Sequence, residues 1–206
     1  MLIKALWTVT YMCVAVILFS SCTNTDPKGS TDNNTGGNTM QQSFQPASAE
    51  STASLENSLK TDSLNTDIRL KLAAAYYTNK EFEKAISHYL YIHQRDKSNL
   101  AALFNLGNIY YDTQQNEQAI VYYQKFLELD KNNSNVRCDL ATCYMNLKKT
   151  DKAISLLREN IKMNNNHLQS HYNLSVMLKQ TGKIAESEAE LSIYNTMSAG
   201  QQQQPQ

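Results

Sequence analysis

Two histidines at helical spacing are the side chains of this sequence best suited to metal chemistry. His167 and His171 are four residues apart, a spacing that can present two imidazoles to one metal ion on a helix. No cysteine, aspartate or glutamate lies beside them at ligand spacing, and His171 occupies a recurring packing position. We therefore expect both histidines to be structural, and we predict no metal site.

Three glutamates near the C-terminal end raise the question of acid–base chemistry. Glu186, Glu188 and Glu190 alternate along the sequence, so on a helix their side chains fan around the axis and cannot act as a pair. A solvated helix face is the interpretation we favour. The sequence also has no phosphate-binding glycine loop, metal motif or nucleophile–histidine–acid order that a fold hypothesis would support. We predict that the protein is not an enzyme, with no catalytic residue and no cofactor.

Two cysteines in the second half of the chain could be redox-active or structural. Cys138 and Cys143 are five residues apart on one expected helix, which places their Cα atoms roughly 8 Å apart. That separation exceeds the reach of a disulfide within one helix. We favour a role as small apolar packing residues over a metal or redox role.

The first 21 residues have the features of an export signal. Lys4 precedes a mostly apolar run over residues 5–19, and two serines follow before Cys22. This junction resembles the lipobox of bacterial lipoproteins, which implies that Cys22 is the lipid-attachment site and bears palmitate or a similar acyl chain. An uncleaved signal anchor is the alternative, because the run is just short of the ~20 residues of a spanning helix. Either interpretation predicts attachment to the cell membrane or outer membrane, with exposure to the periplasm or cell surface.

The segments that flank the main domain differ from it in composition. Residues 22–48 are rich in Ser, Thr, Asn and Gly and cannot bury enough apolar surface to order, so we expect a disordered tether. Residues 49–65 place Ser51, Leu55 and Leu59 on one stripe, which predicts a short capping half-repeat helix. Residues 199–206 are glutamine-rich with no large packing residue, and we expect a disordered tail.

Charge excludes one class of partner. The 206 residues contain 19 Lys+Arg and 19 Asp+Glu, so the formal net charge is zero. A nucleic-acid-binding protein needs a basic face to displace counterions from phosphates. We therefore predict no nucleic-acid partner.

A 34-residue period organises the chain from Thr66 to the C-terminal region. In its best-matched copy, residues 100–133, the apolar spacing predicts a first helix (A) over about 100–112 and a second helix (B) over about 116–129. Asn116 is a candidate N-cap of the second helix. The polar junctions between A and B are short, so the two helices of each unit must be antiparallel.

The residues that recur explain why the two helices of a unit can pack closely. A leucine, a small residue and, in three units, a tyrosine recur on the first helix, and a second small residue recurs on the other. These are Leu72, Leu106, Leu140 and Leu174; Ala73, Gly107, Ala141 and Ser175; Tyr76, Tyr110 and Tyr144; and Ala85, Ala119, Ala153 and Ser187.

These units resemble tetratricopeptide repeats. The resemblance implies an all-α fold, a solenoid of helix-turn-helix repeats wound into a right-handed superhelix. The four units span 66–99, 100–133, 134–167 and 168–198. Asn160 is polar at a packing position, so we expect the junction between the third and fourth units to be the loosest.

In that family the A helices line a concave groove that binds partners, and aromatic and amide side chains suit an extended peptide or a helix. Partial burial between neighbouring A helices is an equally good interpretation of any one aromatic. The groove residues that the resemblance implies are Tyr77, Phe104, Asn105, Asn108, Tyr111, Asp139, Met145, Tyr172 and Asn173.

The residues present argue against one activity of the family, the binding of a partner's C-terminal carboxylate. Repeats that grip a carboxylate use Lys and Arg paired with Asn, and here only Asn108 matches. Uncharged or acidic residues occupy the other positions: Phe104, Asp139, Gln169 and Asn173.

We therefore expect a membrane-tethered scaffold that binds another envelope protein or peptide. The alternatives are a self-associating structural scaffold and an accessory factor for envelope or pilus assembly. The oligomeric state is left open by the sequence.

Overall fold

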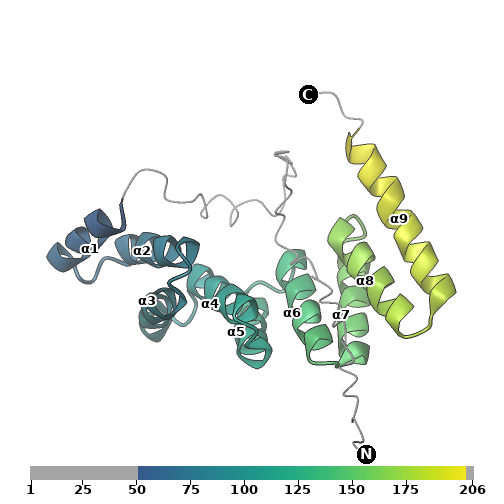
Figure 1. The fold of residues 1–206 in the computed structure, drawn as a ribbon, viewed down its shortest axis with the longest axis horizontal. Helices are drawn as coiled ribbons and strands as arrows, with labels where there is room; N and C mark the ends of the chain where they lie inside the picture. Colours follow the sequence, from purple (N-terminus) through teal and green to yellow (C-terminus); the bar gives the residue numbers. More distant parts are fainter. Residues whose placement is uncertain (1–50, 203–206) are drawn as a thin grey trace, which may run out of the picture.

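The chain folds into a row of helices that follow one another in sequence order (Figure 1). The structure is a computed structural model and describes residues 51–202. Within this range there is one short helix, then four helix pairs, and no strand. The helices are α1 (Thr52–Thr61), α2 (Thr66–Thr78), α3 (Phe82–Arg95), α4 (Leu100–Asp112), α5 (Asn116–Leu129), α6 (Ser134–Asn146), α7 (Thr150–Met163), α8 (Leu168–Gln180) and α9 (Ile184–Gln202).

This arrangement confirms the predicted all-α repeat solenoid. The A helices are α2, α4, α6 and α8, the B helices are α3, α5, α7 and α9, and each helix packs mainly on its neighbours in sequence. The second pair, α4 and α5, has the bounds that the apolar spacing predicted. The predicted export signal, Cys22, the tether and residues 203–206 lie outside the described residues.

An asparagine starts each of the first three A helices. Asn65, Asn99 and Asn133 lie one period apart at the N-cap position of α2, α4 and α6. In each case the side-chain oxygen accepts a hydrogen bond from the backbone N–H three residues later, at 2.9–3.1 Å. This bond satisfies one of the amides that a helix N-terminus leaves without a partner.

The predicted N-cap at Asn116 is wrong. Gln115 occupies that position, no side-chain cap bond forms there, and Asn116 is the first residue of α5. Its side-chain oxygen accepts a hydrogen bond from Asn146 Nδ2 at 3.0 Å. Asn116 therefore links α5 to the end of α6, a partner 30 residues away that the local pattern does not reveal.

Each turn between an A and a B helix contains one residue with left-handed backbone geometry. Lys80, Gln114 and Lys148 have φ of 61°, 61° and 58°, and Gly182 has 77°. Only glycine adopts this conformation at no steric cost. The same tight reversal therefore recurs in all four pairs, with a steric cost in the three turns that have no glycine at this position.

The small residues lie where the helices of a pair approach closely. Ala73, Ala85, Ala119, Ala141 and Ala153 are fully buried. At Gly107 a Cβ would lie 2.4 Å from Cε1 of Tyr123, so the approach of α5 to α4 requires glycine there. The predicted reason for small residues at these positions is confirmed.

Helix α1 covers the N-terminal side of α2. Leu55 is buried against α2, and the Tyr76 hydroxyl donates a hydrogen bond to the Glu56 carboxylate. Its spacing placed Ser51 on the apolar stripe, but this prediction is wrong. Ser51 is the N-cap of α1. Its hydroxyl accepts from the Ser54 N–H at 3.2 Å.

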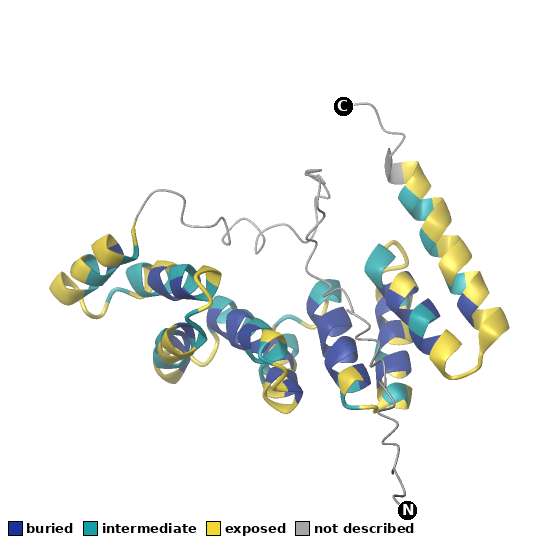
Figure 2. Ribbon diagram, viewed as in Figure 1, coloured by how far each residue is buried: buried dark blue, intermediate teal, exposed yellow. Residues whose placement is uncertain are grey.

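Helix α9 is longer and more exposed than the sequence predicted. It continues to Gln202, whereas we expected disorder from residue 199, because Ala and Gln are good helix formers that extend a helix already nucleated. Leu191 is 39% exposed, although its counterparts Tyr89, Tyr123 and Leu157 are at most 1% exposed. No further A helix covers α9 within the described residues, and α9 is largely exposed at one end of the row (Figure 2).

Candidate partner-binding face

The side chains of α2, α4, α6 and α8 that point away from their B helices form what we call the A-helix face. All nine predicted partner-binding residues lie on these four helices, but their exposure differs. Tyr172 is 37% exposed. Tyr77, Phe104, Asn108 and Tyr111 are half-buried, whereas Asn105, Asp139, Met145 and Asn173 are buried.

Three of the four buried residues, Asn105, Met145 and Asn173, have packing roles. Asn105 Nδ2 donates to the carbonyl of Ala101 at 2.7 Å, and Met145 lies in the core formed by α6, α7 and α8. Asn173 Nδ2 lies 3.4 Å from Thr142 Oγ1, which ties α8 to α6. The Asn105 amide is therefore satisfied within α4, whereas the Asn173 amide holds two neighbouring A helices together, a role that the spacing within one helix did not reveal.

Hydroxyl groups also join adjacent A helices across this face. The Tyr77 hydroxyl donates to the carboxylate of Asp112, connecting α2 to the end of α4. Burial and this hydrogen bond raise the pKa of Tyr77 well above its ordinary value. Burial raises the pKa of Tyr111 to about 12, and the charge of Asp139 acts in the same direction. Both hydroxyls therefore stay protonated at neutral pH and remain hydrogen-bond donors.

The aromatic rings of the A-helix face serve the core as well as the surface. The ring centroid of Phe104 lies 6.0 Å from that of Phe126, and Tyr111 packs on the same cluster. The Tyr172 ring centroid lies 5.2 Å from that of Tyr194 on α9. Truncation of Phe104 and Tyr111 would therefore reduce stability, and only a probe at a more exposed residue separates binding from folding.

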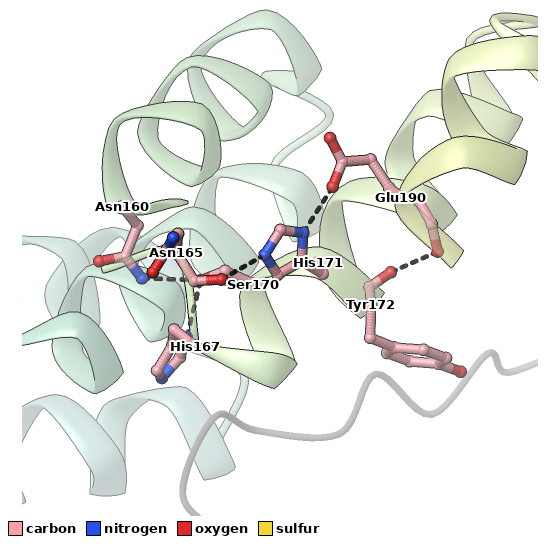
Figure 3. A network of polar contacts seen from close by, with 8 residues as sticks. Asn160, Asn165, His167, Ser170, His171, Tyr172 and Glu190 are labelled. Atoms are coloured by element: carbon pink, nitrogen blue, oxygen red, sulfur yellow. Dashed lines mark hydrogen bonds and ion pairs between the residues drawn. The ribbon is translucent and has the colours of Figure 1, made fainter. Parts of the chain in front are cut away.

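The two candidate metal-binding histidines are engaged in hydrogen bonds (Figure 3). His167 contacts Asn135 Oδ1 through Nε2 and Ser170 Oγ through Nδ1, both at 2.8 Å. His171 contacts Glu190 through Nδ1 at 2.6 Å and the Asn165 carbonyl through Nε2 at 2.9 Å. Over residues 51–202 no group of three or more His, Cys, Asp or Glu side chains could hold a metal ion.

Two of the three glutamates expected on a solvated face instead bridge helices. Glu186 pairs with Arg158 of α7, and Glu190 pairs with the buried His171 of α8. Glu188 is exposed and makes no ion pair within residues 51–202. Glu186 and Glu188 are exposed as expected, whereas Glu190 is half-buried because this side of α9 packs on α8.

The second of the two cysteines considered for redox chemistry is inert. Cys143 is a free, buried thiol, so it is not bridged to Cys138. Burial raises its pKa far above the ordinary value for cysteine, and the charge of Asp139 acts in the same direction. A thiol that stays protonated is a poor nucleophile and metal ligand.

Asn160 was expected to loosen the junction between the third and fourth pairs, yet it makes contacts across it. The side chain is fully buried. Its Nδ2 donates to the carbonyl of Ser134 on α6 at 2.8 Å and to Ser170 Oγ on α8 at 2.7 Å. The sequence shows only that residue 160 is polar. Its hydrogen-bond partners lie on two other helices, α6 and α8.

A family model described as the fourth ARM domain of tetratricopeptide repeat protein 21 matches residues 103–206, half of the chain. The chain belongs to this family. The tetratricopeptide-type assignment therefore rests on a sequence match as well as on the helix pairs. No curated protein sequence matches the chain.

Solved structures support the same repeat fold. A crystal structure of MamA superposes with a TM-score of 0.70 at 18% identity, covering 74% of this chain and 90% of that one. A structure of MamA from residue 41 to its end, from Desulfovibrio magneticus RS-1, gives 0.68 at 10% identity, covering 73% and 85%. The structure titled MamA MSR-1 C2 gives 0.64 at 21% identity, covering 73% and 86%. Identities this low establish the tetratricopeptide-type fold alone.

Proposed function

We propose that this protein is a membrane-tethered tetratricopeptide-type scaffold of the bacterial cell envelope that binds a partner peptide or helix on its A-helix face. The observation that carries the proposal is the run of partly exposed aromatic side chains on three A helices: Tyr77 on α2, Phe104 and Tyr111 on α4, and Tyr172 on α8. Rigid aromatic rings provide contact area at a low cost in conformational entropy. Asn108 is half-buried beside them; its Oδ1 accepts a hydrogen bond from the Tyr123 hydroxyl, which leaves its Nδ2 to donate to a peptide backbone.

A photo-crosslinking amino acid placed at Tyr172 tests the proposed face. Tyr172 is 37% exposed, so an aromatic photoprobe there replaces a ring of similar shape without filling the core. We expect covalent adducts with another envelope protein when cells are irradiated, detected as shifted bands and identified by mass spectrometry.

Val121 supplies the matched control for this experiment. It lies on the outer side of α5, a B helix, and is 46% exposed. The same probe at Val121 should give no such adduct. Adducts at Val121 and none at Tyr172 would place the binding surface on the B helices and contradict the proposal.

The membrane attachment is a proposal from the residues around Cys22, which lie outside the described range. Within residues 51–202, no helix has the length and apolar character needed to cross a bilayer. If Cys22 bears the lipid, Cys22→Ser should move the protein from the membrane to the soluble fraction on ultracentrifugation. Membrane retention of the variant with residues 1–21 still attached would instead favour an uncleaved signal anchor.

A second candidate function is self-association into a structural scaffold. The observation that favours it is the exposure of Leu191 and Ile193, at 39% and 42%, on α9 at the end of the row. Sedimentation of a fragment spanning residues 49–202 distinguishes the two functions. A monomer at high protein concentration would exclude self-assembly as the main role.

A further inference from the structure

The fourth A helix begins with a different residue from the other three. Asn65, Asn99 and Asn133 cap α2, α4 and α6 through their side-chain oxygens. One period later the N-cap residue of α8 is His167, and its side chain makes no cap bond. The imidazole instead lies between Asn135 of α6 and Ser170 of α8, at 2.8 Å from each.

The partners around His167 fit a neutral ring. Ser170 Oγ accepts a hydrogen bond from Asn160 Nδ2, which leaves its own hydrogen to donate to Nδ1 of His167. Nδ1 must therefore carry no proton, and Nε2–H donates to the side-chain oxygen of Asn135. A second proton, on Nδ1, would face the hydrogen of Ser170 and break this chain of bonds.

The surroundings also oppose a charge on His167. Burial, and to a smaller extent a positive charge on His171, lowers the pKa of His167 to about 4. Two glutamates of the packed helices make ion pairs with groups other than His167. Glu190 of α9 contacts His171, and Glu159 of α7 lies 3.9 Å from Arg137 of α6.

The direction of the pH effect follows from these values. Above a pH of about 6.5, the ordinary histidine pKa, His167 is neutral in both the packed and the opened state, so pH has no effect through it. Between that value and the lowered pKa of about 4, only the opened state binds the proton. The packed junction therefore loses stability as the pH falls through this window.

We propose that the junction between the third and fourth helix pairs is an acid-sensitive hinge, in which a proton on His167 breaks the contacts that join α6, α7 and α8 and loosens the fourth pair. The inference goes beyond the proposed binding function and does not depend on it. Its consequence for the surface is that Tyr172, on α8, changes position relative to the rest of the A-helix face in acid.

Hydrogen exchange followed by mass spectrometry on the full-length chain tests the hinge. Exchange is compared at pH 7.5 and pH 4.5 after correction for the intrinsic effect of pH on amide exchange. We expect peptides from α8 to lose protection at pH 4.5 by roughly 50-fold more than peptides from α4, a helix that contains no histidine. Equal losses in the two helices would overturn the proposal.

The matched variant is His167→Asn, which gives α8 the residue found at the other three caps. It should keep the protection of α8 at pH 4.5 because asparagine does not titrate. His167→Gln provides a second nontitrating test if the first variant is not helical at pH 7.5. Retention of the full acid-induced loss in the folded variant would show that His167 is not the responsible group.

His88→Asn controls for acid sensitivity elsewhere in the chain. His88 is a half-buried histidine of α3, and burial, followed by the charge of Arg69, lowers its pKa as well. This variant should leave the acid-induced loss of protection in α8 unchanged. A variant that removed the loss would place the responsible proton in the first pair and contradict the hinge.

Discussion

Phe126→Ala should lower the free energy of unfolding by about 3–5 kcal/mol, because it leaves a large cavity at a site that cannot collapse. Phe126 is 1% exposed and lies in the core formed with Tyr123, Val136 and Leu140. The surrounding side chains belong to helices held on both sides, so they can move only slightly into the space. Urea unfolding followed by circular dichroism at 222 nm measures the loss.

Val121→Ala in the same helix is the control for this prediction. Val121 is 46% exposed, so its truncation removes little buried surface and should change stability by no more than about 0.5 kcal/mol. Similar losses for Val121→Ala and Phe126→Ala would mean that burial of the side chain does not determine how much each residue stabilises α5. That result would contradict the core described between α5 and α6.

Gly107→Ala should destabilise the protein by about 1–3 kcal/mol, although alanine is the better helix former by about 1 kcal/mol. The added Cβ would lie 2.4 Å from Cε1 and 2.6 Å from Cδ1 of Tyr123. The Tyr123 ring cannot move away freely, since it is 1% exposed and its hydroxyl donates to Asn108 at 2.8 Å. Thermal and urea unfolding both measure this loss.

Two further variants separate the steric effect from other causes. Gly200→Ala adds a Cβ that meets nothing within 4 Å, so it should be neutral or slightly stabilising. Tyr123→Leu combined with Gly107→Ala recreates the pair that the third unit already has, Ala141 with Leu157. We expect a favourable coupling of about 1–2 kcal/mol in this double-mutant cycle. Strict additivity would show that Tyr123 is not what excludes alanine.

Several parts of the fold could be predicted because the information for them is local. The 34-residue period identified the repeat, and the spacing of Leu103, Leu106 and Tyr110 gave the bounds of α4. Small residues such as Ala119 mark the points where the helices of a pair meet, and these lie within a single unit. The period of an amphipathic helix and the small residues needed for close packing can both be recognised in the sequence itself.

The candidate binding site was less predictable because exposure depends on helices far apart in sequence. Asn105 and Asn108 both lie on the outer side of α4 by spacing, but the structure buries only Asn105 fully. Asn173 is buried where α8 approaches α6, more than 30 residues earlier. How closely successive A helices approach is set by the packing of the B helices between them, and no pattern within one helix records it.

By itself the sequence determined the all-α repeat, the pairing of its helices and the small residues at their contacts, since each follows from spacing within one 34-residue unit. Only the tertiary structure decided which A-helix side chains remain exposed. It also gave His167 hydrogen-bond partners on α6 and α8, and left the outer side of α9 uncovered within the described residues. These features depend on contacts between units, where the neighbouring helix, rather than the local period, determines the environment of a side chain.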